Sequence, residues 1–411
     1  MSDSETSFWR RPIVVLAAAM MFVLFTWGIR QSWGLLLRPI TDGFGWGREE
    51  LSLAFATNSL LVGLASPFAG AIADKWGPVK VLLIGAVLYT GSLIWMAHAT
   101  TPEGMFWSAG VFGGIGQGAA GLTLILSIVG RVAGEERRSL WFGLVSGAAT
   151  AGQLVIVPIY QHVLDRSGWA ETVLVMAGMA ALLVPLGAAM SKAGQAALAK
   201  KDHQTLGQAV NEARRHKGFL MLTAAFFVCG FQLQFIANHL PAYLQDKGAA
   251  GMLGASAIAL IGLFNMIGTW GAGVLGQRLR KKYLLCCVYL GRSLIMLVFI
   301  HVPVTPLTVQ LFAAGVGTLW LATLPLTSGM VATMFGPRYM ATLYGIVFVS
   351  HQVGSFMGVW LGGRLYDITG SYMTSWWMAI ALGGIAALLH FPIDDRPVAR
   401  LRAGTATRAA E

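Results

Sequence analysis

The chain has 411 residues, of which 56% are hydrophobic and only 11% are charged, and its formal net charge is +11. A soluble domain carries about 25% charged residues, so this composition argues against a soluble protein and predicts a membrane protein. A positive charge of this size can indicate a nucleic-acid partner, and the placement of the charges decides whether it does here.

Twelve apolar stretches are each long enough to cross a bilayer, which takes about 20 helical residues. In chain order they are residues 12–37, 50–73, 78–98, 105–130, 139–164, 169–190, 218–243, 253–277, 283–302, 306–334, 340–365 and 372–393. No Asp or Glu lies in the middle of any of them. The sequence therefore predicts an all-α membrane protein with twelve transmembrane helices.

Lys and Arg are unevenly distributed between the two sets of loops. With both termini in the cytoplasm, 22 of the 29 Lys and Arg residues lie on that side and five lie outside. The remaining two, Arg30 and Arg292, lie within the membrane. Because short cytoplasmic loops are enriched in Lys and Arg, we expect a multi-pass protein of the inner (plasma) membrane with both termini cytoplasmic. The surplus charge then reflects topology in a lipid bilayer, and we expect no nucleic-acid partner.

The polar segment 191–217 divides the spans into six and six, and a shift of 202 residues relates the two groups. It places Gly28 on Gly230, Arg30 on Gln232 and Asp165 on Asp367. We therefore expect two pseudo-symmetric six-helix bundles, residues 1–190 and 218–395, with a cytoplasmic linker at 191–217 and a cytoplasmic tail at 396–411. Parallel repeats of this kind are typical of transporters in which one half rocks against the other.

The segment between spans 2 and 3 reads GAIADKWGPVK (residues 70–80). It resembles the cytoplasmic loop motif of the major facilitator superfamily, and the resemblance implies the major facilitator fold over nearly the whole chain. In that family the acid caps a neighbouring helix and pairs with bases. The resemblance therefore implies a gating role for Asp74 with Lys75, and for Gly70 and Gly77, with Arg137 or Arg138 as possible partners of Asp74.

The second copy of this motif, GVLGQR (residues 273–278), keeps the glycine and the base Arg278 but has Gln277 at the acid position. This difference implies a weaker second latch.

Three further segments resemble the monocarboxylate and oxalate/formate branch of that superfamily: GIRQSWG (28–34), GWGREELS (45–52) and LYDITGSY (365–372). The chain departs from the branch at its substrate residues. The helix 8 Asp/Arg pair of animal monocarboxylate carriers falls on Asn265 and Thr269, and the helix 11 lysine of oxalate carriers falls on His351. The helix 1 lysine falls near Gln31, beside Arg30. The resemblance thus implies an anion carrier, and its substrate-binding residues differ from those of the branch.

Arg30 lies about seven residues, or roughly 10 Å, from the expected outer end of span 1. An intramembrane arginine costs about 2.5–3.5 kcal/mol on insertion scales and usually faces a polar cavity. Its side chain could extend to the interface, but Trp27, Trp33 and Gly34 flank the same helical face. Because a guanidinium binds a carboxylate through two hydrogen bonds, we expect Arg30 to bind an anionic substrate, with Trp27 and Gln31 beside it.

Other polar residues in the spans are candidates for the substrate-binding lining: Gln117, Gln153, Gln232, Asn238, Asn265, His351 and Gln352. The alternative for each is a hydrogen bond between helices. His351 and His239 are the candidates for proton coupling, because histidine titrates near pH 6.5. Arg292 either binds substrate or ties helix carbonyl groups together, and the latter is favoured.

These patterns predict a secondary active transporter of a small organic anion, with a proton-coupled monocarboxylate favoured. Anion exchange, export of a larger and mostly apolar compound, and a transporter-like receptor or sensor remain alternatives. The segment GAATAGQ (147–153) lacks the Gly-Pro pair of drug/proton antiporters, which counts against drug export. We find no phosphate-binding loop, catalytic set or metal-ligand spacing, so we expect no enzyme activity, cofactor or metal. We expect a monomer; the sequence leaves substrate, direction and coupling ion open.

Overall fold

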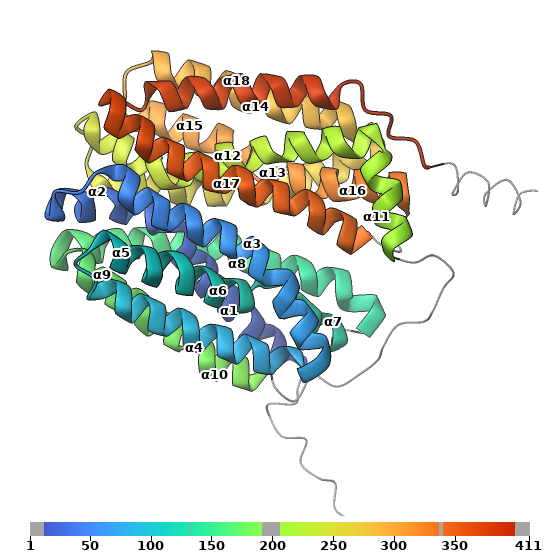
Figure 1. The fold of residues 1–411 in the computed structure, drawn as a ribbon, viewed down its shortest axis with the longest axis horizontal. Coiled ribbons are helices and arrows are strands. Elements are labelled where there is room, and N and C mark those ends of the chain that lie inside the picture. Colours follow the sequence, from blue (N-terminus) through green and yellow to red (C-terminus); the bar gives the residue numbers. More distant parts are fainter. Residues whose placement is uncertain (1–11, 133, 191–205, 337–339, 399–411) are drawn as a thin grey trace, which may run out of the picture.

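A computed structural model describes residues 12–132, 134–190, 206–336 and 340–398 (Figure 1). Every regular element within these residues is a helix, and twelve helical segments are long and apolar enough to span a membrane. The twelve predicted spans are therefore confirmed, each to within a few residues except at the end of the first. In Figure 1 the spans run across the view, with the C-terminal six above the N-terminal six.

The first six spans are built from eleven helical elements. Span 1 is α1 (Pro12–Gln31) with α2 (Trp33–Phe44), span 2 is α3 (Arg48–Trp76) and span 3 is α4 (Pro78–Ala97). Span 4 comprises α5 (Pro102–Met105), the π-helix η2 (Phe106–Phe112), α6 (Gly113–Ala119) and α7 (Leu122–Val132). Span 5 is α8 (Gly134–Ser167), and span 6 is α9 (Trp169–Ala181) with α10 (Leu183–Ala189).

The second six spans follow a short helix, α11 (Leu206–Arg215), which lies in the part of the predicted linker that the structure describes. They are α12 (Lys217–Asp246), α13 (Gly251–Arg278), α14 (Lys281–His301), α15 (Pro306–Leu319) with α16 (Thr323–Phe335), α17 (Met340–Thr369) and α18 (Met373–His390). The N-terminal and C-terminal groups of six are called the N half and the C half below.

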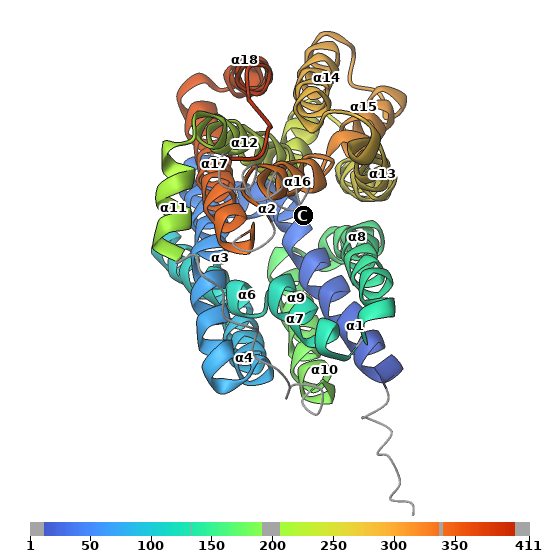
Figure 2. The same ribbon diagram turned by 90° about the vertical axis from the view of Figure 1, so that its right-hand side faces the viewer.

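The two ends of the molecule differ in charge. The helix ends near residues 77, 132, 190, 216, 280 and 336 lie at one end of the molecule; the sequence beside them carries most of the Lys and Arg, so this end is called the Lys/Arg-rich end. The loops near residues 46, 100, 168, 248, 303 and 371 form the Lys/Arg-poor end. Figure 2 views the molecule from the Lys/Arg-rich end, with the C half above the N half.

Glycines at equivalent positions bring equivalent helices together in both halves. A side chain at Gly28 would collide with Ile156, and one at Gly152 would collide with the backbone of Leu24, so span 1 packs closely on span 5. In the C half, Gly230 and Gly354 meet backbone atoms of the facing helices α17 and α12. Small residues allow this close approach of membrane helices. The repeat of 202 residues therefore corresponds to a repeated packing contact.

Spans 4 and 10 are both interrupted at related positions. The helix of span 4 breaks at Ala120 and Gly121, and that of span 10 breaks between Leu319 and Thr323. A break leaves backbone N–H and C=O groups without helical partners, which must be satisfied by other groups in the membrane. Broken helices of this kind surround the binding sites of many transporters.

Candidate functional site

Arg30 lies near the middle of span 1. The helix continues after a turn at Ser32 as far as Phe44, because α2 keeps a buried apolar face beyond the end of the apolar run. Arg30 is thus fourteen residues, or about 21 Å at 1.5 Å per residue, from the end of the span. The expected seven residues underestimate the distance from Arg30 to the end of the helix.

The guanidinium of Arg30 has one hydrogen-bond partner among the described residues. Its Nη1 donates to Gln117 Oε1 at 3.2 Å, and Gln117 Nε2 donates to the hydroxyl of Tyr89 at 3.4 Å. Gln117 lies one turn before the break in span 4. Within the described residues no carboxylate lies within 4 Å of Arg30. A guanidinium carries five N–H donors, so most of them remain free for a ligand.

The sequence predicts Trp27, Trp33 and Gly34 beside Arg30. Trp27 is partly buried nearby on α1, but Gly34 lies beyond the turn at Ser32 and packs against the backbone of Ala237 and Asn238 in α12. The expected cleft of Trp27, Trp33 and Gly34 around Arg30 stays a prediction. Gly34 forms part of the contact between the two halves.

Gln31 and Gln153 form a polar link from the N half to the C half. Gln31 Nε2 donates to Gln153 Oε1 at 3.1 Å, and Gln153 Nε2 donates to the backbone oxygen of Ile258 at 2.6 Å. Both side chains are buried. They lie at the boundary between the halves.

Arg292 is buried in the C half and is satisfied by the break in span 10. Its Nε and Nη2 donate to the backbone oxygen of Leu319 at 3.0 and 2.7 Å, and Nη2 also donates to that of Trp320 at 2.7 Å. Asn265 Oδ1 accepts from the freed N–H of Leu321 at 3.0 Å. The interpretation of Arg292 as a residue that ties carbonyl groups together is supported by these contacts, and Asn265 takes part in the same break.

The remaining predicted lining residues lie in three places. Gln232 lies within the C half, where its Nε2 donates to the backbone oxygen of Ala379 in α18 at 2.9 Å. Asn238 lies at the contact with α2. His351 Nδ1 lies 3.0 Å from Gln352 Oε1, and Gln352 Nε2 donates to the backbone oxygen of Ser59 in the N half at 2.5 Å. Gln352 thus bonds across the boundary between the halves, and His351 lies next to it within the C half.

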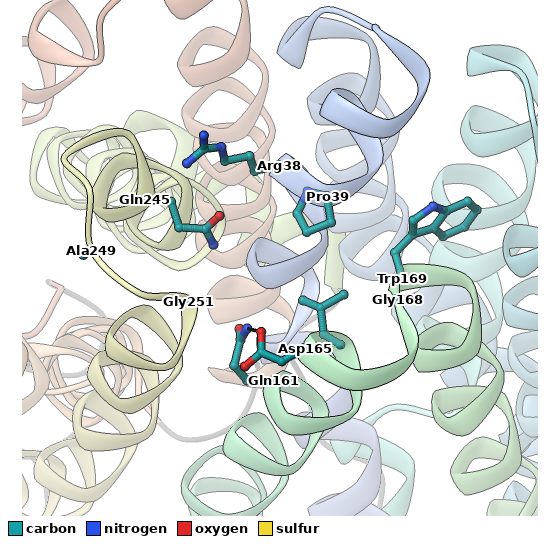
Figure 3. A pocket seen from close by; sticks show the side chains of 10 residues that line it. Arg38, Pro39, Gln161, Asp165, Gly168, Trp169, Gln245, Ala249 and Gly251 are labelled. Carbon is teal, nitrogen blue, oxygen red and sulfur yellow. Dashed lines mark hydrogen bonds between the residues drawn. The ribbon is translucent and has the colours of Figure 1, made fainter.

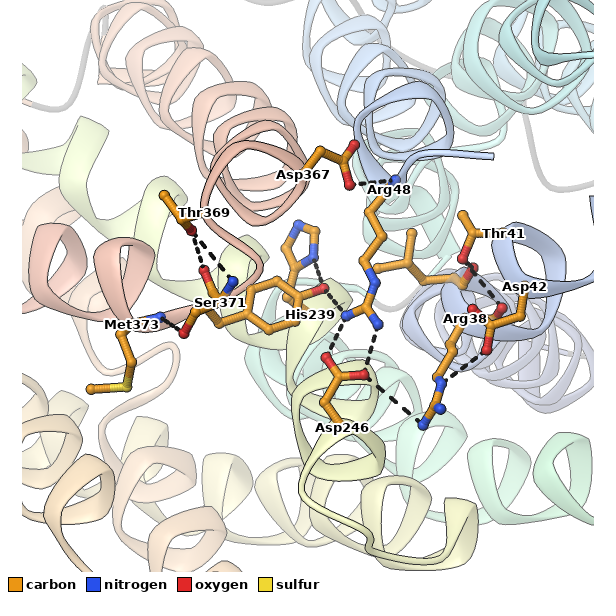
Figure 4. A network of polar contacts seen from close by, with 12 residues as sticks. Arg38, Thr41, Asp42, Arg48, His239, Asp246, Asp367, Thr369, Ser371 and Met373 are labelled. Atoms are coloured by element: carbon orange, nitrogen blue, oxygen red, sulfur yellow. Dashed lines mark hydrogen bonds and ion pairs between the residues drawn. The ribbon is translucent and has the colours of Figure 1, made fainter. Parts of the chain in front are cut away.

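An ion-pair network joins the halves at the Lys/Arg-poor end (Figure 4). Arg48 binds Asp246 through two hydrogen bonds, of 2.6 and 2.7 Å, and its Nη1 donates to the hydroxyl of Tyr372 at 3.0 Å. Its guanidinium also covers the ring of Tyr366, 3.7 Å from the centroid. His239 belongs to this network, because its Nδ1 lies 3.2 Å from the Tyr372 hydroxyl.

The N-terminus of α3 is capped from the other half. Its first residue follows Gly47, which has no side chain to act as a cap. Asp367 of the C half accepts from the backbone N–H groups of Arg48 and Glu49 at 2.9 and 2.7 Å (Figure 4 shows the bond to Arg48). Glu49 in turn accepts from Trp360 and Arg364 at 3.1 and 2.9 Å. A negative charge at a helix N-terminus is stabilising, so this cap holds the halves together.

The sequence did not single out this network. Arg48 was counted as a loop charge, and Asp367 was noted only as the repeat of Asp165. The segments 45–52 and 365–372, which resemble the monocarboxylate and oxalate/formate branch, contain Arg48, Asp367 and Tyr372 of this network. No local pattern, however, pairs Arg48 with Asp246, 198 positions along the chain.

A cavity of about 410 Å³ lies beside this network (Figure 3). Its wall comprises Arg38, Pro39, Gln161, Leu164, Asp165, Gly168 and Trp169 from the N half and Gln245, Ala249 and Gly251 from the C half. Asp165 accepts from Gln161 Nε2 at 2.7 Å and does not reach the N-terminus of α13. The repeat of the Asp367 cap is therefore not formed on this side.

Hydrogen bonds and ion pairs between the halves are confined to one side. In the described parts of the chain they extend from the Lys/Arg-poor end to Ser59, Gln153, Ile258 and Gln352 near the middle of their helices. On the Lys/Arg-rich side, none joins the two halves among those residues. The geometry is that of a two-half transporter closed at its Lys/Arg-poor end.

Comparison with known proteins agrees with this geometry. Residues 13–358 match the sequence profile of the Major Facilitator Superfamily. The chain belongs to this superfamily.

Its relatives in the superfamily are distant. The uncharacterised MFS-type transporter YcxA of Bacillus subtilis (strain 168) is 25% identical over 397 residues, covering 94% of this chain and 96% of YcxA. Monocarboxylate transporter 13 of Rattus norvegicus is 24% identical over 391 residues, covering 92% of this chain and 88% of its own. The protein is a multi-pass membrane transporter of this superfamily and not an enzyme.

Solved structures share the fold. A mutant form of the nucleoside transporter NupG superimposes with a TM-score of 0.78 at 15% identity and covers 92% of this chain and 99% of its own. The D-xylose–proton symporter has a TM-score of 0.70 at 17% identity and covers 93% and 97%. The predicted major facilitator fold is confirmed.

The superfamily loop motif lies at the Lys/Arg-rich end. Gly77 ends α3 with a φ of 92°, which favours glycine, and Lys75 is exposed. Arg278 is exposed in the last turn of α13, and a side chain at Gly70 would meet no atom within 4 Å. The side chains of Asp74, Arg137 and Arg138 lie outside the described residues, so the gating roles of Asp74, Lys75, Gly70, Gly77 and Arg278 stay predictions.

Proposed function

We propose that this superfamily member carries a small organic anion, a monocarboxylate in the first place, and that Arg30 binds the carboxylate. The observation that supports this proposal is the free hydrogen-bonding capacity of Arg30. The guanidinium is half-buried near the middle of span 1 and uses one of its donors on Gln117. A carboxylate can take two parallel hydrogen bonds from such a group.

Gln117, which bonds to Tyr89, positions the guanidinium, and Gln31, the next residue after Arg30, bonds to Gln153 at the boundary between the halves. Because no carboxylate among the described residues lies within 4 Å of Arg30, a bound anion supplies the missing negative charge and lowers the cost of the buried cation. The similarity to monocarboxylate transporter 13 favours the same class of substrate.

Transport proceeds by alternating access in this proposal. The Arg48–Asp246 pair and the Asp367 cap close the Lys/Arg-poor end, which the positive-inside rule places outside the cell. The substrate then exchanges with the cytoplasm through the Lys/Arg-rich end. Rocking of one half on the other breaks these bonds and opens the outer side.

Proton symport is the proposed coupling, because an anion and a proton cross together without net charge. Anion exchange is the alternative, and it differs in requiring a second anion inside the vesicle. The closed network is compatible with symport and with exchange, so the uptake experiment below tests both.

The proposal is tested by uptake into proteoliposomes with purified protein. The probes are radiolabelled L-lactate, pyruvate, formate and oxalate, with uridine and L-alanine as neutral and zwitterionic controls. We expect uptake of at least one carboxylate, stimulated by an acidic exterior and reduced at least about tenfold by Arg30→Gln, the equivalent of about 1.5–3 kcal/mol for a charged hydrogen bond. Arg214→Gln, which removes an exposed charge on α11, is the control.

Uptake that excludes all four carboxylates, or that Arg30→Gln leaves unchanged, would overturn the proposal. Uptake that requires an internal anion and ignores the pH gradient would replace symport with exchange.

A further inference from the structure

A second polar cluster lies wholly within the C half, apart from Arg30. Its centre is the thiol of Cys229 on α12, which is 1% exposed. Arg292 Nη1 of α14 lies 3.6 Å from the sulfur, and Thr323 Oγ1, the first residue of α16, lies 3.2 Å from it. The cluster therefore sits where span 10 breaks, with a thiol beside a buried cation.

Tyr289 provides a second and independent observation. Its side chain is fully buried one turn before Arg292, and its hydroxyl lies next to the same sulfur. The hydroxyl has no hydrogen-bond partner among the described residues. A thiol is a weak acceptor, whereas a thiolate accepts strongly. Arg292 and Thr323 contact the sulfur, and the unpartnered hydroxyl of Tyr289 lies nearby, an arrangement that suits a negative charge.

The charged and titratable groups around this sulfur come from three helices. Arg292 and Tyr289 face it from α14, and His351 and Tyr344 face it from α17. From α18, His390 stacks on the ring of Tyr289 at 5.1 Å. Thr323 of α16 carries no charge.

Arg292 is the one fixed charge in this group of residues. Its positive charge, with Nη1 3.6 Å from the sulfur, favours an anion at Cys229, because a nearby opposite charge stabilises the ionised form.

We propose that Cys229 is the proton-binding site of the C half, a thiolate beside Arg292 that is protonated through His351. In this step the N–H bond of the imidazolium breaks and an S–H bond forms. The products are a neutral thiol and a neutral imidazole, and no electrons are transferred. The proton is the ligand.

His351 connects this site to the boundary between the halves. Its ring stacks on Phe348 at 5.4 Å, and its Nδ1 contacts Gln352, which binds the backbone of Ser59 across the boundary. A proton that passes through His351 therefore passes beside a bond that must break when the halves move. This link between protonation and transport rests on the proton coupling proposed above.

The test is a spectroscopic titration that needs no transported substrate. The double variant Cys286→Ser/Cys287→Ser leaves Cys229 as the only cysteine of the three in the chain. Thiolates absorb in the ultraviolet where thiols do not, so absorbance of the purified protein is followed as the pH is raised from acid to mildly alkaline. Subtraction of the same titration of a protein that also carries Cys229→Ser removes the tyrosine contribution.

We expect a one-thiolate step centred at or below about pH 8, lower than the value of about 8.5 for a free thiol. Arg292→Lys retains the step, and Arg292→Gln moves it upward by at least about one pH unit. A difference spectrum without a thiolate step below about pH 9 overturns the proposal, and that result does not depend on whether either Arg292 variant folds.

The two proposals fail separately. The titration reports on the sulfur whether or not a carboxylate is carried, whereas Arg30→Gln in the uptake assay leaves Cys229 unchanged. A thiolate step together with uptake that excludes carboxylates would reject the anion assignment alone.

Discussion

Two arginines lie within the spans, and their surroundings give them different roles. Arg292 is fully buried and its donors are used by the carbonyl groups that the break in span 10 releases. Arg30 is half-buried and has one partner, Gln117, among the residues that the structure describes. A satisfied cation stabilises the fold, whereas a cation with free donors is held ready for a ligand at a cost in stability.

The same substitution in both arginines therefore has opposite effects on stability. Arg292→Met leaves the oxygens of Leu319 and Trp320 without donors, which costs about 1–3 kcal/mol for each buried group. Arg30→Met removes an unpaired charge and leaves the free energy of unfolding unchanged or higher. Thermal unfolding of the purified proteins in detergent measures both. A larger loss of stability for Arg30→Met than for Arg292→Met would contradict this assignment.

At this scale the sequence predicted the residues better than their contacts. Arg30 and Gln117 were both identified as intramembrane polar groups, but their hydrogen bond joins positions 87 apart. Gln232 was expected to line the substrate path as a polar residue within a span, and its Nε2 bonds to the backbone of Ala379 in α18. Periodicity indicates which residues share a helical face, but it does not say which neighbouring helix that face meets.

Among the elements, α3 depends on the C half for its N-terminal cap. Gly47 cannot cap the helix, and Asp367 supplies the missing acceptor. Asp165, its repeat in the N half, bonds to Gln161 and leaves the N-terminus of α13 uncapped. These two residues are related by the duplication, but only Asp367 caps a helix of the other half.

Asp367→Ala and Asp165→Ala form a matched pair of variants. A lost helix cap costs about 0.5–2 kcal/mol, so Asp367→Ala shifts the protein toward opening at the Lys/Arg-poor end, and Asp165→Ala does not. The reporter is Ser52→Cys, which is buried against Gly363, in a background that carries Cys287→Ser to remove the exposed native cysteine. Labelling by a membrane-impermeant maleimide should rise severalfold for Asp367→Ala alone. Equal labelling of both variants would disprove the trans cap as a closing contact.

The Arg48–Asp246 pair is the second closing contact. Asp246→Asn leaves the buried Arg48 without its bidentate partner, and hydrogen bonds to charged groups are worth about 1.5–3 kcal/mol. The same Ser52→Cys reporter should label at least about tenfold faster. Asp42→Asn is the control, because it removes an equal charge from the exposed pair with Arg38. No difference between these two variants would show that the pair does not hold the gate.

The spans were predictable because about twenty apolar residues must form a helix in lipid, where backbone groups need partners within the segment. The turn at Ser32 and the breaks near Gly121 and Trp320 were not predicted. They occur inside apolar sequence, and the groups that satisfy the span 10 break, Arg292 and Asn265, come from other helices. The apolar pattern of a span does not indicate such contacts with residues of other helices.

For the whole molecule, the charge distribution predicts the orientation. Thr305 is exposed in a loop at the Lys/Arg-poor end and Arg280 is exposed at the Lys/Arg-rich end. In intact cells an impermeant maleimide should label Thr305→Cys and should not label Arg280→Cys, in the Cys287→Ser background. The reverse pattern would invert the topology, and with it the assignment of the closed end as the outer one.

The duplication was read from the sequence and recurs as packing, since Gly28 and Gly152 repeat as Gly230 and Gly354 at equivalent crossings. The closed end was not predicted. It depends on bonds such as Arg48–Asp246, which join loop-proximal charges of opposite halves, and these charges look like ordinary topology signals in the sequence. Conformational state is thus a property of contacts between the halves, and each half taken alone does not reveal it.

The central claim is that Arg30 binds a carboxylate, and ligand-induced stabilisation tests it most directly, since a ligand that binds the folded state raises the unfolding temperature. The measurement is the unfolding temperature of purified wild type, Arg30→Gln and Arg214→Gln with L-lactate, pyruvate, formate and oxalate. The account predicts that at least one carboxylate stabilises wild type and Arg214→Gln and leaves Arg30→Gln unchanged. Equal stabilisation of all three proteins, or stabilisation by no carboxylate, would contradict it.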